Sequence, residues 1–253
     1  MSSDSRPERA TRRFGRPGWL ARIGRHELGL LVGVALIAGG CWAFAKLGGE
    51  VREGDTTSFD EWWLRAFRNP HDLGDAIGSP AFEDSVRDIT ALGSITIVAL
   101  IVFVALGVLF LERKYHAALL VTVSVTGGML LSTVLKLGYA RPRPTLVPHL
   151  VNVNTPSFPS GHSMISAVAY LTLGALFARV HARRSVKAFV LLVTAALVVA
   201  IGVSRVYLGV HYPTDVLAGW CAGATWASLC WLAARWLQSR GAVEAEGEGA
   251  ALA

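Results

Sequence analysis

Long runs of apolar residues, separated by shorter polar segments, dominate the chain. A helix needs about 20 apolar residues to cross a bilayer core of ~30 Å. Six runs approach or exceed this length, at approximately 28–47, 90–111, 115–135, 161–180, 187–208 and 214–236. The fifth is interrupted near its end by Arg205. The pattern predicts an all-α protein in which residues 28–237 form one domain, a bundle of six transmembrane helices.

Composition supports a membrane protein and excludes a disordered chain. Hydrophobic residues make up 53% of the sequence and charged residues only 17%, whereas soluble domains have roughly 25% charged residues. The first run, Leu28–Leu47, is longer than the ~7–15 apolar residues of a signal peptide, so we predict that it is retained as a span. Cys41, Cys221 and Cys230 all lie in apolar runs and have no disulfide or metal-ligand spacing.

The positive charges lie between the apolar runs, which disfavours nucleic acid as a partner. They instead predict how the protein is oriented in the membrane, because cytoplasmic loops carry the excess of Lys and Arg. Seven arginines precede the first run: Arg6, Arg9, Arg12, Arg13, Arg16, Arg22 and Arg25. The second–third and fourth–fifth connections are also basic, with Arg113, Lys114, Arg179, Arg183, Arg184 and Lys187. We therefore expect a cytoplasmic flank at 1–27 and a disordered cytoplasmic tail at 238–253.

Three connections are then predicted to be extracytoplasmic: 48–89, 136–160 and 209–213. The first holds four arginines and ten acidic residues. Within it, Ser58 and Glu61 have the spacing of a capping box, so a short helix is expected over 58–67. Its apolar residues share one face: Phe59, Trp62, Trp63, Ala66 and Phe67. This amphipathic helix is expected at the membrane interface, either as a packing cap over the bundle or as a substrate gate.

Small residues recur four positions apart in two spans, at Gly29 and Gly33 and at Gly219 and Gly223. Such pairs let helices approach closely, within one bundle or between two copies. We favour packing inside the bundle over a dimer face. The oligomeric state stays open.

The outer ends of spans three to six carry three compact polar blocks, at 136–144, 159–162 and 204–215. Lys136, Arg143 and Arg205 supply positive charge that suits phosphate oxygens. Ser160 and Gly161 open a helix, whose N-terminal N–H groups favour an anion. Each residue type alone has ordinary explanations such as snorkelling. Together they predict an anion-binding site on the extracytoplasmic face.

Two histidines add the chemistry of group transfer to this anion site. His211 and Asp215 are four residues apart, so the carboxylate can hold one ring nitrogen and leave the other free to attack. His162 has no acidic residue nearby in sequence, which suits a general acid. Spacing alone does not assign the two roles.

The three blocks read K-x6-R-P, P-S-G-H and S-R-x5-H-x3-D, and the chain resembles the type 2 phosphatidic acid phosphatase family in all eleven specified residues. The resemblance centres on residues 136–215. An additional Arg141-Pro142 precedes Arg143-Pro144, and the K-x6-R-P spacing selects Arg143. By this resemblance His211 is the nucleophile, Asp215 orients it and His162 is the general acid. The phosphate-binding residues are Lys136, Arg143, Ser160, Gly161 and Arg205.

The resemblance implies a membrane phosphatase that acts on a lipid phosphate or pyrophosphate without a metal or other cofactor. Undecaprenyl pyrophosphate, phosphatidic acid and phosphatidylglycerophosphate are the expected substrate classes. A phosphotransferase with the same phosphohistidine and a catalytically idle scaffold or transporter are the alternatives. Vanadium-dependent haloperoxidases are similar around the anion site, but they are soluble, which six apolar spans contradict.

Overall fold

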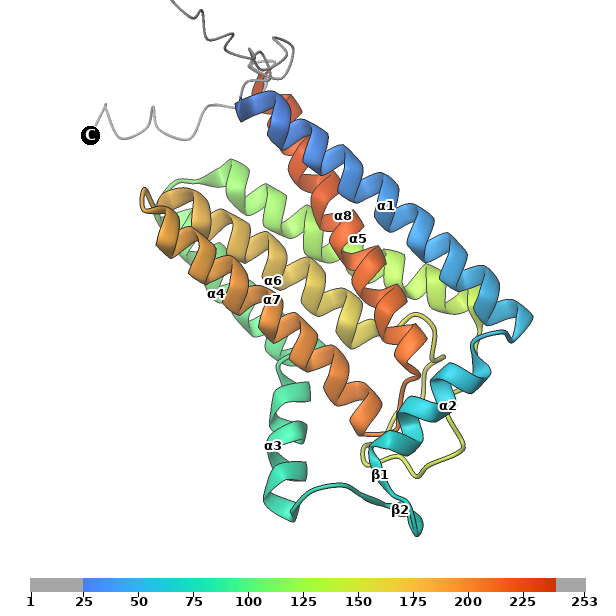
Figure 1. Ribbon diagram of the computed structural model, residues 1–253. Coiled ribbons are helices and arrows are strands. Elements are labelled where there is room, and N and C mark those ends of the chain that lie inside the picture. Colours follow the sequence, from blue (N-terminus) through green and yellow to red (C-terminus); the bar gives the residue numbers. More distant parts are fainter. Residues whose placement is uncertain (1–24, 240–253) are drawn as a thin grey trace, which may run out of the picture.

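The computed structural model describes residues 25–239, which form a bundle of long helices with a small cap at one end (Figure 1). In chain order the elements are α1 (Arg25–Glu53), α2 (Thr57–Ala66), β1 (Arg68–Asn69), β2 (Asp72–Ala76), α3 (Pro80–Ala91), α4 (Ile95–Leu111), α5 (Tyr115–Tyr139), α6 (Gly161–Val180), α7 (Arg184–Tyr207) and α8 (Pro213–Ser239). The expectations of a basic flank and a disordered tail fall largely on residues 1–24 and 240–253, outside the described part.

Five helices, α1 and α5 to α8, are long and apolar enough to cross a membrane. The helices α3 and α4 pass the same test as a pair, bent by 50° where they meet, and taken as one broken span they make the sixth. The predicted all-α bundle of six spans is therefore confirmed, but the run at 90–111 is divided between two helices. The Ser94 side chain restarts the helix, because it accepts a hydrogen bond from the N–H of Ile97 at 3.3 Å.

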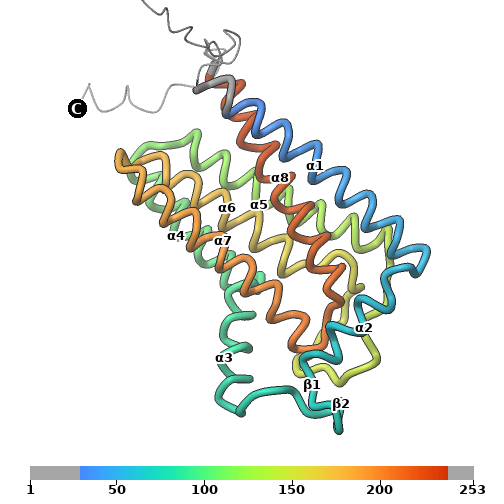
Figure 2. Tube along the Cα trace, viewed as in Figure 1, coloured from blue at the N-terminus to red at the C-terminus, as the bar shows by residue number. Residues whose placement is uncertain are grey.

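The central helix is α6, which contacts α4, α5, α7 and α8, while α1 lies along α8 at the edge (Figure 2). Small residues allow these approaches. A Cβ atom on Gly219 would lie 2.7 Å from the carbonyl oxygen of Ser160, and one on Gly223 would lie 2.6 Å from that of Met164. A Cβ on Gly33 would lie 3.0 Å from a Leu232 methyl group. The interpretation of these glycines as contacts within the bundle is confirmed.

At the capped end, α2 confirms the expected short helix but not its capping box. Thr56 occupies the N-cap position and Ser58 lies inside the first turn. The Thr56 hydroxyl donates to Asp60 Oδ2 at 3.1 Å instead of capping a backbone N–H. Glu61 pairs with Arg65 at 3.4 Å along the same helix.

The face of α2 that packs on the bundle also differs from the apolar stripe of the sequence. Leu64 and Asp60 are buried, while Trp62 is 61% and Phe59 46% exposed. The helix contacts α7 and α8 with its Asp60 and Leu64 face, so it is a packing cap over the bundle whose aromatic side chains point outward.

Two further elements of this cap were not expected. The strands β1 and β2 form an antiparallel hairpin, and α3 follows it. A helix signal for α3 is present in the sequence: Ser79 caps the helix by accepting a hydrogen bond from the N–H of Phe82, and Pro80 occupies the first turn.

Candidate active site

The structure brings the three polar blocks together at the capped end of the bundle, where α5 ends, α6 and α8 begin and α7 ends (Figure 1). The N–H of Ser160 donates to the Asp215 carbonyl at 2.9 Å, which joins the starts of α6 and α8. Lys136 Cε lies 3.3 Å from the Cβ position of Gly161, which joins α5 to α6. Charge counting along the sequence, which used no motif, also assigned all three blocks to one face.

His211 and Asp215 form the pair that the sequence spacing predicted, with His211 Nδ1 3.4 Å from Asp215 Oδ2. Both side chains are fully enclosed, at 1% and 0% exposure. The Ser157 hydroxyl donates to the same carboxylate oxygen at 2.5 Å and lies 3.2 Å from His211 Nδ1. The backbone N–H of Tyr212 donates to it as well, at 2.9 Å. Asp215 Oδ2 and the Ser157 oxygen can both accept a hydrogen bond from Nδ1, which favours a proton on Nδ1 and leaves the lone pair on Nε2.

The free nitrogen of His211 faces the arginine chosen from the K-x6-R-P spacing. Arg143 Nη1 lies 3.2 Å from His211 Nε2 and donates to the Val210 carbonyl at 2.6 Å. Burial is the main cause that lowers the pKa of His211 to about 3; Arg205 and Arg143 act in the same direction, and Asp215 opposes them. The imidazole is therefore neutral at neutral pH, as a nitrogen nucleophile must be.

Three cations of this region have no carboxylate partner of their own. Lys136 Nζ donates to the Pro156 carbonyl at 2.6 Å, and Arg143 donates to both oxygens of Thr155. Within residues 25–239 neither of them, nor Arg205, forms an ion pair. Clustered cations repel one another, so this arrangement favours an anion between them.

Arg205 carries a buried donor suited to an anion. Its side chain is 3% exposed. Nη1 donates to Thr90 Oγ1 at 3.0 Å, whereas the buried Nε has no partner among the described residues. A buried charged donor without an acceptor is costly, and a phosphate oxygen would satisfy it.

The start of α6 supplies the backbone part of the anion site. Ser160 is the N-cap residue, and its side chain accepts a hydrogen bond from the N–H of Ser163. The N–H groups of Gly161 and His162 precede the first acceptor within the helix and remain available to a ligand. The His162 side chain forms no hydrogen bond within residues 25–239 and lies against Gly93, at the bend between α3 and α4.

Four polar residues of this region had no assigned role in the sequence analysis: Asp60, Thr90, Arg141 and Ser157. In the sequence, Arg141 was noted only as an additional arginine before Arg143. Asp60 lies between Ser58 and Glu61, the two residues of the expected capping box. Thr90 and Ser157 carried no signal, because their contacts with Arg205 and Asp215 join segments far apart in the sequence.

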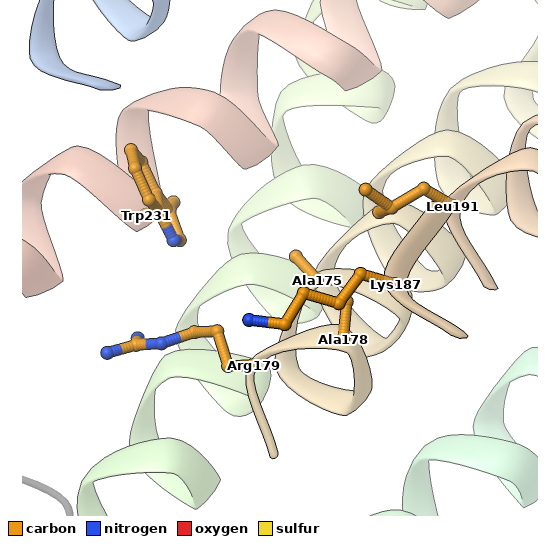
Figure 3. A pocket seen from close by; sticks show the side chains of 6 residues that line it. All are labelled: Ala175, Ala178, Arg179, Lys187, Leu191 and Trp231. Carbon is orange, nitrogen blue, oxygen red and sulfur yellow. The ribbon is translucent and has the colours of Figure 1, made fainter. Parts of the chain in front are cut away.

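A shallow pocket of about 240 Å³ lies at the opposite end of the bundle and contains none of these residues (Figure 3). Its lining comes from the end of α6, the start of α7 and the second half of α8: Ala175, Ala178, Arg179, Lys187, Leu191 and Trp231. No group of His, Cys, Asp or Glu side chains suited to hold a metal ion occurs in the part of the chain that the structure describes.

Comparison with known proteins agrees with this geometry. The family model of the PAP2 superfamily matches residues 117–239. Phosphatidylglycerophosphatase B of Bacillus subtilis is 37% identical over 150 residues, which is 58% of this chain and 72% of that protein. Decaprenylphosphoryl-5-phosphoribose phosphatase of Mycobacterium tuberculosis is 31% identical over 128 residues, 49% of this chain and 66% of that protein.

A solved structure shares the whole bundle. The crystal structure of a transmembrane PAP2-type phosphatidylglycerolphosphate phosphatase from Bacillus subtilis superimposes with a TM-score of 0.73 at 28% identity. The match covers 80% of this chain and 98% of that one. With its membrane-spanning helices and its similarity to named phosphatases, the chain is an integral membrane lipid phosphatase and belongs to the PAP2 superfamily.

Proposed function

We propose that the protein hydrolyses a lipid phosphate or lipid pyrophosphate through a phosphohistidine on His211 Nε2. The observation that carries this proposal is that the two ring nitrogens of His211 have different neighbours. Nδ1 lies against Asp215 and Ser157, while Nε2 faces Arg143. A lone pair directed at the anion site is what in-line attack on phosphorus requires.

In the first step, the lone pair of Nε2 forms a bond to phosphorus and the bond from phosphorus to the lipid oxygen breaks. His162, at the head of α6, gives its proton to the departing oxygen. The developing imidazolium of His211 is stabilised by the buried carboxylate of Asp215. The phosphoryl oxygens lie among Lys136, Arg143 and Arg205.

In the second step, neutral His162 accepts a proton from water, whose oxygen attacks the phosphohistidine. The bond between nitrogen and phosphorus breaks, phosphate leaves and His211 returns to its neutral form. The two steps need no metal ion, because the cations and the N–H groups of Gly161 and His162 stabilise the charge of the transition state.

We place the site on the extracytoplasmic side. The described basic connections, Arg113–Lys114 and Arg183–Lys187, lie at the other end of the bundle from His211, and basic connections mark the cytoplasmic side. The site then lies at the level of the lipid headgroups, where a phosphate group is at hand.

Phosphatidylglycerophosphate is the first substrate to test, since phosphatidylglycerophosphatase B is the relative of which this chain covers 72%. Phosphatidic acid and undecaprenyl pyrophosphate are the other two classes. All present a terminal phosphate on a lipid, and the anion site recognises that shared group.

The test is phosphate release by purified protein in detergent with EDTA present, on each of the three lipids. We expect release by the wild type and none above background by His211→Ala. His116→Ala is the matched control, because His116 is exposed at the start of α5, at the other end of the bundle. It should retain wild-type turnover.

Other outcomes would redirect the assignment. A strict requirement for a divalent metal, or full activity in His211→Ala, would contradict the phosphohistidine mechanism. Consumption of the lipid phosphate without phosphate release would identify a phosphotransferase. Absence of any reaction on all three lipids would favour a catalytically idle scaffold.

A further inference from the structure

Asp60 is a buried carboxylate on an otherwise exposed part of α2. It is 0% exposed, whereas its neighbours Phe59 and Glu61 are exposed or partly exposed. Oδ1 accepts a hydrogen bond from the N–H of Thr214 at 3.1 Å, and Oδ2 accepts one from the Thr214 hydroxyl at 2.8 Å. The carboxylate thus binds the first turn of α8, next to Asp215.

Arg141 connects this carboxylate to the site. Its Nη2 donates to Asp60 Oδ2 at 2.8 Å, and its Nη1 donates to Asp215 Oδ1 at 2.7 Å. The guanidinium also lies over the Tyr212 ring, 4.1 Å from its centre. Burial alone lowers the pKa of Arg141, but the carboxylates of Asp215 and Asp60 outweigh burial and raise the pKa above its usual value.

These contacts separate Arg141 from the other cations of the site. Lys136, Arg143 and Arg205 have no carboxylate partner within residues 25–239, whereas Arg141 is held between two carboxylates. Its charge is therefore already balanced and is not available to a phosphate. Asp60 balances Arg141, which leaves the charge of Asp215 to act on His211.

We infer that Asp60 and Arg141 are positioning residues, which fix Asp215 and keep its negative charge on the nucleophile. Because this inference rests on the proposed phosphohistidine mechanism, it predicts an effect on the chemical step. Asp60 is a carboxylate and Arg141 is already paired with Asp60 and Asp215, so neither is placed to bind the phosphate, and substrate binding should change little.

The first test is Asp60→Asn, which keeps the shape of the side chain and removes its charge. With phosphatidylglycerophosphate we expect kcat to fall about 10- to 100-fold. A loss of this size is typical when a residue that holds a functional side chain in place is removed. KM and the inhibition constant of inorganic phosphate should stay within about twofold of wild type.

Glu61→Gln is the matched control, because it makes the same chemical change one residue along α2. Among residues 25–239, Glu61 forms an ion pair only with Arg65, at 3.4 Å, on the helix surface. Its kcat and KM should equal those of the wild type.

A second pair of variants tests whether Asp60 and Arg141 act as one unit. Arg141→Gln should lower kcat as Asp60→Asn does, and the double variant should lose no more than the worse single variant. Arg141→Lys restores the charge and should recover part of the lost kcat. If Asp60→Asn does not fold, by its tryptophan fluorescence and melting temperature, the Arg141 variants decide the question alone.

Wild-type kcat in folded Asp60→Asn or Arg141→Gln would overturn the inference. So would a raised KM with unchanged kcat, the result expected of phosphate-binding residues and therefore of Arg143→Gln. His211→Ala in the same assay distinguishes the two proposals. If it retains activity, or if the wild type releases no phosphate, the proposed function has failed and not only the positioning.

Discussion

At the residue scale, the two nitrogens of His211 have opposite surroundings within one ring. Nδ1 lies against a carboxylate and a hydroxyl, and Nε2 against a guanidinium. A cation beside Nε2 opposes protonation and, in the proposed mechanism, attracts the phosphate that Nε2 attacks. Arg205 and Arg143, which disfavour a proton on His211, would thus also bind its substrate.

His162 should act in both steps, which a change of leaving group can reveal. We expect His162→Ala to lower turnover of the lipid substrate by about 10²- to 10⁴-fold, the usual contribution of general acid–base catalysis. With p-nitrophenyl phosphate, whose leaving group departs without a proton, the variant should release nitrophenolate in a rapid burst followed by slow turnover. If the burst rate fell as much as turnover of the lipid substrate, His162 would not be the general acid.

The pKa of His211 also predicts how stability depends on pH. Burial lowers that pKa from 6.5 to about 3, so between these values the unfolded chain binds a proton that the folded protein does not. This contribution to stability is fully present above pH 6.5 and is lost as the pH falls toward 3. The melting temperature of His211→Gln should therefore fall less steeply than that of the wild type below about pH 6.5. Equal slopes would contradict the buried neutral imidazole.

At the scale of elements, the active site depends on how closely α6 and α8 approach, because Ser160 and Asp215 stand at their first turns. Gly219 and Gly223 of α8 lie against the backbone of α6. The spacing between the two helices thus determines whether the anion site and the nucleophile meet.

Gly223→Ala should separate these helices, since the added Cβ would lie 2.6 Å from the Met164 carbonyl oxygen and 2.8 Å from Ala167 Cβ. We expect a loss of about 1–3 kcal/mol in the free energy of unfolding, typical of overpacking, and a lower kcat. Gly39→Ala is the control, because no atom lies within 4 Å of that Cβ position. Similar melting temperatures for the two variants would exclude the packing role.

The sequence also predicts some helices more accurately than others. The run at 161–180 matches α6 in full, because its ends are marked by Ser160 and by basic residues. The division at Ser94 was missed, because Thr90 and Ala91 continue the apolar run and the N-cap at Ser94 was not recognised as the start of a new helix. Local patterns gave the motif residues, but the roles of Asp60 and Thr90 depend on partners 154 and 115 positions away.

At the scale of the whole molecule, the bundle has two chemically different ends. One carries the proposed nucleophile His211, the cations and the cap made by α2, the hairpin and α3. The other carries the basic connections and the shallow pocket (Figure 3). This polarity predicts a fixed orientation in the membrane.

Cysteine labelling measures that orientation. In a Cys41→Ala background, which removes the exposed native thiol, Thr145→Cys should react with an impermeant thiol reagent added to intact cells. Ser185→Cys should react only after the cells are opened. Both positions are exposed and lie at opposite ends of the bundle. The reverse result would invert the topology.

The packing of α1 on α8 joins the first span to the last. During synthesis α1 enters the membrane long before its main partner exists, and its many exposed apolar side chains, such as Leu30, Leu31 and Val32, suit that period in lipid. Gly33 can pack against Leu232 only after α8 has been inserted. Because α8 also carries Asp215, the bundle and the proposed catalytic site are completed by the same helix, and we expect a chain still in synthesis to be inactive.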